Sequence, residues 1–193
     1  LYLLDIGVTI FSFYRFLFPI FAEGLYGLGA VGVGFLAASN SIGGILGSVI
    51  VLYTAKWQRK GVLVLVATAI YALLLIAFGS IPIFVIGLVI VAGLGATDAV
   101  GMVMRQTVVQ LTTPDRLLGR ASSAHSFAAM GANNVGQMEV AFMSAGVGAG
   151  PTMVIGGVVS IFVVGLIWKF VPGVSNYRYM PDAERDAAEN ESV

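Results

Sequence analysis

Ionisable side chains stand inside segments that are otherwise apolar, and these are the residues with the means to do chemistry. Asp98 lies within the apolar run 82–111, and Arg105 follows it seven residues later. A charge at the centre of a bilayer costs about 2.5–3.5 kcal/mol, so such residues face a watery cavity or a partner. A carboxyl group there can exchange a proton, and a guanidinium can bind an anion. Asp98 is therefore a candidate proton carrier.

Further polar residues follow the same pattern in neighbouring segments. Arg15 lies too deep in the run 1–22 to reach the membrane surface easily, which favours pairing with a substrate or a carboxylate. Structural alternatives stay open: snorkelling for Arg105, a gate or ion pair for Glu139, and interhelical hydrogen bonds for the amides. The candidates for proton coupling are Asp98, Glu139 and Asp5, and those for a substrate cavity are Arg15, Arg105, Asn40, Asn133, Asn134 and Gln137.

The composition assigns the chain to a membrane. Of its 193 residues, 58% are hydrophobic and 10% charged, with a mean hydropathy of +0.95, which is more apolar surface than a water-soluble domain can bury. The absence of cysteine excludes thiol chemistry, a single histidine argues against a metal site, and zero net charge argues against nucleic acid. A bilayer needs roughly 20 apolar residues per helix. Six segments meet this: 1–22, 29–55, 61–79, 82–111, 119–145 and 151–171.

Basic residues orient these six segments. They occur in the connections 56–60 and 116–120 and beyond the sixth segment, whereas the other three connections contain no Lys or Arg. The positive-inside rule therefore places both chain ends in the cytoplasm, which we take to be that of a bacterium with the protein in its plasma (inner) membrane. The polar stretch 174–193 is expected to be a cytoplasmic tail. Because the chain opens inside an apolar run, we expect it to be part of a longer protein.

The polar residues are distributed in two matching triplets. In each triplet the first two segments carry polar side chains, whereas the third carries no charge over 62–78 and only Lys169 over 152–170. This predicts an all-α membrane fold, a six-transmembrane-helix bundle (1–173) made of two three-helix inverted repeats, each with one lipid-facing helix. Small residues recur at every fourth position of each second helix, either for packing within the bundle or for sliding against a second one. They are Ser39, Gly43 and Gly47, and Ala124, Ala128, Ala132 and Gly136.

Three stretches are similar to one known family. The run 98–120 resembles the tenth-to-eleventh helix signature of the enterobactin-exporter-like efflux branch of the major facilitator superfamily. The run 131–139 resembles the motif of the following helix, with Gln137 where Glu is usual. The run 14–19 resembles the seventh-helix pattern, with Tyr14 where Pro is usual. The resemblance implies that the six segments are helices seven to twelve, the C-terminal half of a twelve-helix transporter.

Composition, polar pattern and resemblance together predict one half of a secondary active transporter. We expect a proton-coupled exporter of a small amphiphilic or anionic compound, siderophore- or drug-like, that works by alternating access as an antiporter and is not an enzyme. Its partners would be the substrate, protons, the bilayer and an N-terminal six-helix half. No cofactor is expected, because the fingerprint-like run 27–32 follows no strand. The alternatives are a transport-incompetent assembly or regulatory subunit, and an intramembrane aspartyl hydrolase that pairs Asp5 with Asp98.

Overall fold

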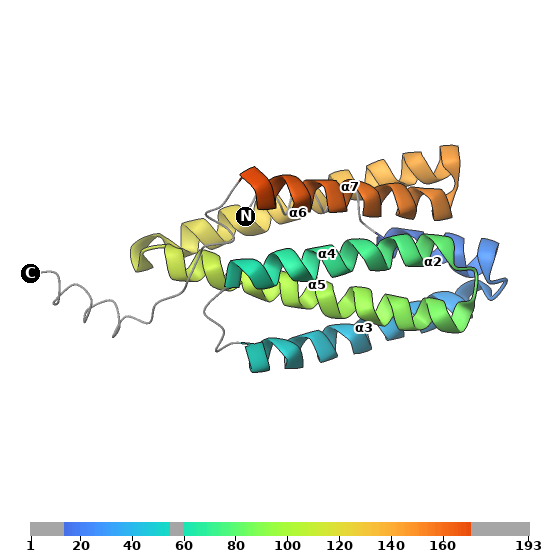
Figure 1. The fold of residues 1–193 in the computed structure, drawn as a ribbon, viewed down its shortest axis with the longest axis horizontal. Coiled ribbons are helices and arrows are strands. Elements are labelled where there is room, and N and C mark those ends of the chain that lie inside the picture. Colours follow the sequence, from blue (N-terminus) through green and yellow to red (C-terminus); the bar gives the residue numbers. More distant parts are fainter. Residues whose placement is uncertain (1–13, 55–59, 171–193) are drawn as a thin grey trace, which may run out of the picture.

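The computed structural model describes residues 14–54 and 60–170, and this part of the chain is all-helical (Figure 1). Five long helices run side by side, with α3 along one edge, α4 and α5 in the middle, and α6 and α7 along the other edge. All of their ends lie within two residues of the ends predicted from the apolar runs. They are α3 (Gly29–Thr54), α4 (Lys60–Ser80), α5 (Phe84–Thr112), α6 (Leu118–Val147) and α7 (Ala149–Phe170).

Four of these helices are long and apolar enough to cross a membrane, namely α3, α4, α5 and α7. Helix α6 has 30 residues, but its amides, carboxylate and hydroxyls make it markedly less apolar than the others. The described part is therefore a helical membrane bundle. The expected tail 174–193 and most of the first expected segment lie outside the described residues, and the inverted repeat stays a prediction.

The first expected segment is not a uniform α-helix where the structure describes it. Residues Tyr14–Leu17 form a 3₁₀ turn (η1), Phe18–Ile20 a short α-helical piece (α2), and Phe21–Leu25 a π-helical turn (η2). Proline within α2 has no N–H to donate, and its ring clashes with the carbonyl four residues earlier, which accounts for a change of pitch here. The segment also continues to Leu25, three residues beyond its expected end at Ala22.

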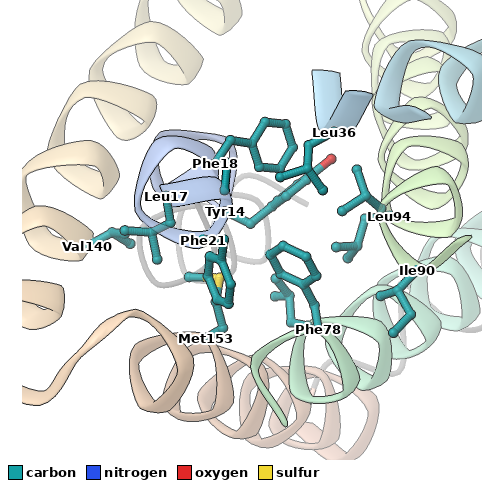
Figure 2. Packing of buried hydrophobic residues seen from close by; sticks show 13 residues of the cluster. Tyr14, Leu17, Phe18, Phe21, Leu36, Phe78, Ile90, Leu94, Val140 and Met153 are labelled. Atoms are coloured by element: carbon teal, nitrogen blue, oxygen red, sulfur yellow. The ribbon is translucent and has the colours of Figure 1, made fainter. Parts of the chain in front are cut away.

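This short segment is the hub of the bundle. Tyr14, Leu17, Phe18 and Phe21 are buried, and Figure 2 shows their side chains surrounded by residues from all five long helices. Their neighbours in this cluster include Leu36 of α3, Phe78 of α4, Leu94 of α5, Val140 of α6 and Met153 of α7. Because Arg15 lies between the buried residues Tyr14 and Leu17, the packing of this cluster also sets the position of the Arg15 backbone.

Helices α3 and α5 pack together through small residues. A Cβ atom at Gly43 would overlap the carbonyl oxygen of Ala92, and one at Gly47 would overlap that of Ala96. One turn earlier, the Ser39 hydroxyl donates a hydrogen bond of 2.5 Å to the Leu88 carbonyl. The contact therefore advances by four residues on both helices, as in a parallel pair whose backbones touch. The small-residue stripe of α3 thus serves packing inside the bundle.

Candidate functional site

An ion pair joins two of the predicted residues at the middle of the bundle. Arg15 Nη2 lies 2.7 Å from Asp98 Oδ2, although the two residues are 83 positions apart in the chain. Asp98 is the central residue of α5, so it lies at the depth farthest from both ends of that helix. The side chains of Arg15 and Asp98 are 47% and 38% exposed. The pair is therefore open to space beside the described helices rather than sealed in the core.

Arg15 is held in place by its neighbour Tyr14. The Tyr14 side chain is buried, and its hydroxyl donates a hydrogen bond of 2.5 Å to Asn40 Oδ1 on α3. Its ring stands edge-on to Tyr71 of α4, with the ring centroids 6.0 Å apart. The guanidinium carbon of Arg15 lies 5.8 Å from the centroid of the Tyr14 ring, within range of a cation–π attraction. The hydrogen bond to Asn40 and the contact with Tyr71 hold the Tyr14 ring in place. The cation–π contact with that ring in turn orients the Arg15 guanidinium.

The backbone around Asn40 is equally constrained. A Cβ atom at Gly95 would overlap the Asn40 carbonyl oxygen, so α5 touches α3 directly at this level. Asp98 lies one turn beyond Gly95 on α5. The hub segment, α3 and α5 therefore meet at one depth, where they assemble Tyr14, Arg15, Asn40 and Asp98. We call these four residues the central polar cluster.

A charge pair of this kind is a costly feature for a membrane helix. Desolvation of each ion is expensive, and removal of one partner leaves the other uncompensated. Helix α3 contains no charged residue, so it can contribute hydrogen bonds to the ion pair but no charge that would balance it. Such an arrangement is expected where a charge has a task, such as binding an ion or carrying a proton.

The other predicted residues are not in this cluster. On α6, Asn133 and Gln137 are half-buried and Asn134 is exposed, and none of the three makes a hydrogen bond with another described residue. Glu139 Oε2 is buried and has no hydrogen-bond partner among the described residues. Asp5 and the side chain of Arg105 lie outside the described part of the chain.

Of the residues around the ion pair, Asn40 was predicted as a cavity candidate, whereas Tyr14 and Tyr71 were not predicted. Tyr14 stood out in the sequence only as a departure from the family pattern, and nothing in the sequence pointed to Tyr71. The adjacency of Tyr14 to Arg15 was the available signal, because a tyrosine one residue from a cation in an apolar run is well placed to orient it. Within the described ranges, no three His, Asp or Glu side chains gather as a metal site would require.

A separate cavity of about 310 Å³ lies where η2 meets the α4–α5 turn and the start of α7. Its walls are mostly apolar side chains and glycine backbone, including Ile20, Leu25, Pro82 and Gly150, with Ser80 as the polar exception. None of its lining residues belongs to the central polar cluster. The cavity is thus distinct from the site that carries the charges.

Comparison with known proteins shows which proteins this chain is similar to. Enterobactin exporters named EntS from Escherichia coli O1:K1, E. coli O139:H28 (strain E24377A) and Shigella boydii serotype 18 are each 32% identical to this chain over 113 residues. The chain is related to the enterobactin exporters. This confirms the predicted resemblance to the enterobactin-exporter-like branch of the major facilitator superfamily.

The extent of the match is limited. It covers 58% of this chain and 27% of each relative, so the chain matches about a quarter of the length of these exporters. No family model matches the chain, and no solved structure matches it. The relationship and the four apolar helices together identify a multi-pass membrane protein with relatives among transporters.

Proposed function

We propose that this chain is the C-terminal six-helix half of a twelve-helix secondary exporter. Its substrate would be a small amphiphilic or anionic compound, siderophore-like or drug-like, and its transport would be coupled to protons. The relationship to proteins named enterobactin exporters supports the class. The Arg15–Asp98 ion pair at the centre of α5 is the observation that carries the mechanism.

In this mechanism the substrate binds near the midplane, between this bundle and an N-terminal half. The partly exposed side chains of Arg15 and Asp98 support this position, because they face open space rather than the packed core. Asp98 takes up and releases the coupling proton, and Arg15 binds or balances charge. Rocking of the two halves then exposes the site alternately to either side of the membrane.

The same proposal includes the placement of the protein. The chain would lie in a bacterial inner membrane as two inverted three-helix repeats, with both ends in the cytoplasm, because the basic connections favour that side. An intramembrane hydrolase would need Asp5 beside Asp98, and Asp5 lies outside the described residues. We favour the exporter because the described partner of the Asp98 carboxylate is a cation, Arg15.

The test is flux through proteoliposomes that contain the full-length parent protein, with enterobactin as the probe. We expect its flux to respond to an imposed pH gradient. Asp98→Asn should reduce the pH-dependent flux at least tenfold while the protein still inserts, because the amide cannot carry the proton. Glu23→Gln is the matched control, since this exposed carboxylate lies in η2, away from the central polar cluster.

Two results would contradict the proposal. Normal pH-dependent flux in Asp98→Asn would remove Asp98 from the mechanism. A parent protein that inserts correctly but moves no probe would favour the alternative of an assembly or regulatory subunit.

A further inference from the structure

The Arg15–Asp98 pair restricts the charge of what can bind beside it. The guanidinium stays protonated under all physiological conditions, whereas the carboxyl group has a neutral form. With Asp98 ionised the pair is neutral as a whole, and with Asp98 protonated it carries one positive charge. A single uncompensated charge at the middle of a membrane is costly. The protonated state of the pair is therefore the state that needs an anion.

Among the residues that the structure describes, no side chain other than Asp98 forms an ion pair with Arg15. Asp5 and the Arg105 side chain lie outside that part of the chain. The hub segment contributes Tyr14 and Arg15 itself, and α4 contributes the Tyr71 ring. Helix α3 presents the neutral amide of Asn40 and has no charged residue. Helix α6 carries Arg120, His125 and Glu139, and Glu139 forms no described hydrogen bond or ion pair. Helix α5 carries Asp98 and, two turns further, Arg105.

We propose that an anionic group of the substrate and a proton bind to this site together. Water delivers the proton to the Asp98 carboxylate, the contact with Arg15 breaks, and Arg15 pairs instead with the anionic group of the substrate. No other charge changes, so the loaded site is as neutral overall as the empty one. The inference rests on the proposed function and specifies its substrate class and the sign of its coupling.

The geometry favours an anion on Arg15 over a cation on Asp98. A cation that approached Asp98 would meet the Arg15 guanidinium 2.7 Å from the same carboxylate, and the site would keep a net positive charge. Arg15 is also the more exposed partner of the pair. The Tyr14 ring, which is buried, supports the guanidinium from within the bundle, with 5.8 Å between the guanidinium carbon and the ring centroid. An anionic group that pairs with the guanidinium is therefore the chemistry that this site fits.

This coupling has a direction. Because the anion and the proton bind together, they cross the membrane together in the same direction, and the two carry no net charge. Export would then be powered by the outward gradient of the substrate itself. The expected antiport requires the opposite, namely that substrate and proton exclude each other from the site.

The test measures binding to the purified full-length parent with two probes of fixed charge. Benzenesulfonate is an aryl anion, phenyltrimethylammonium is the cationic control, and neither titrates between pH 5.5 and 8.5. We expect the affinity for benzenesulfonate to rise as the pH falls, by up to about tenfold per unit for one linked proton. Calorimetry in buffers of different ionisation enthalpy should show uptake of about one proton per anion bound.

Variants separate the two partners. Asp98→Asn should bind benzenesulfonate with an affinity independent of pH and with no proton uptake, because its amide already resembles the protonated acid. Arg15→Gln should lose at least tenfold in affinity at every pH. If that variant does not fold, Arg15→Lys serves instead, and it should keep the pH dependence at reduced affinity because the charge remains.

Several outcomes would overturn the inference. They are an absence of saturable benzenesulfonate binding, an affinity that is flat or rises with pH, and preferential binding of the cation with proton release. Failure here is distinguishable from failure of the proposed function. Enterobactin flux without proton-linked anion binding contradicts only the inference, whereas linked binding without any flux contradicts only the exporter.

Discussion

Helices α3 and α6 are predicted counterparts, the second helix of each triplet, yet they use their polar residues differently. On α3, Ser39 donates to the backbone of α5, and Asn40 accepts from Tyr14. On α6, the amides at 133, 134 and 137 make no hydrogen bond with another described residue, and Glu139 Oε2 is buried without one. Both helices have a small-residue stripe, but that of α3 demonstrably brings two backbones into contact.

The difference shows which helix has its polar groups satisfied within this bundle. A buried polar group without a partner costs about 1–3 kcal/mol, so polar groups that remain unsatisfied favour whatever can bond them. Helix α3 has already matched its polar residues with neighbours inside the chain. On α6 the buried Glu139 Oε2 has no such partner among the described residues, whereas the amides at 133, 134 and 137 are half-buried or exposed. Of these two helices, α6 is therefore the one with a buried polar group, Glu139, that would gain from a further partner.

The largest expected effect concerns the α3–α5 contact. Gly43→Ala should destabilise the full-length parent by about 3 kcal/mol, because the new Cβ would overlap the Ala92 carbonyl oxygen and only separation of the helices relieves that. Gly44→Ala is the matched control, since nothing lies within 4 Å of a Cβ there. It should be neutral or stabilise by up to about 1 kcal/mol, as alanine favours helix over glycine.

Thermal unfolding in detergent measures both variants. Opposite signs for two adjacent glycines would establish that the stripe is a packing surface. Equal effects would mean that α3 and α5 do not touch at Gly43. The contrast between α3 and α6 would then be wrong, because it depends on that contact.

A smaller effect is expected for the bond that anchors the hub segment to α3. Tyr14→Phe and Asn40→Ala should each cost about 0.6–1.7 kcal/mol, the range for interhelical hydrogen bonds in membranes. Because both remove the same bond, the double variant should cost less than the sum of the two single variants. Unfolding of all three measures this coupling. Strict additivity would show that the bond contributes nothing.

The helices themselves were predictable, because length and hydropathy fix them. Apolar runs interrupted by turns placed the ends of all five long helices within two residues. The change of pitch between Tyr14 and Leu25 was not predicted, since it depends on how Pro19 is accommodated among its neighbours rather than on hydropathy.

The site was only partly predictable for the same reason. Arg15 and Asp98 were predicted separately, because an ion in an apolar run is conspicuous in any sequence. Their contact spans 83 positions, and it depends on the relative rotation of two helices, which hydropathy does not encode. The stripe of α3 left two alternatives open, and only the overlap of Gly43 with α5 decides between them.

The smallest expected effect is on α6, and it decides whether the contrast with α3 holds in the whole protein. Asn134→Ala should change the unfolding free energy of the parent by no more than about 0.5 kcal/mol, because the side chain is exposed and makes no described hydrogen bond. The same measurement on Asn40→Ala provides the comparison. A loss as large as that of Asn40→Ala would mean that the Asn134 amide is already bonded elsewhere in the parent. In that case the polar groups of α6 would be satisfied like those of α3, and they would not mark a surface that awaits a partner.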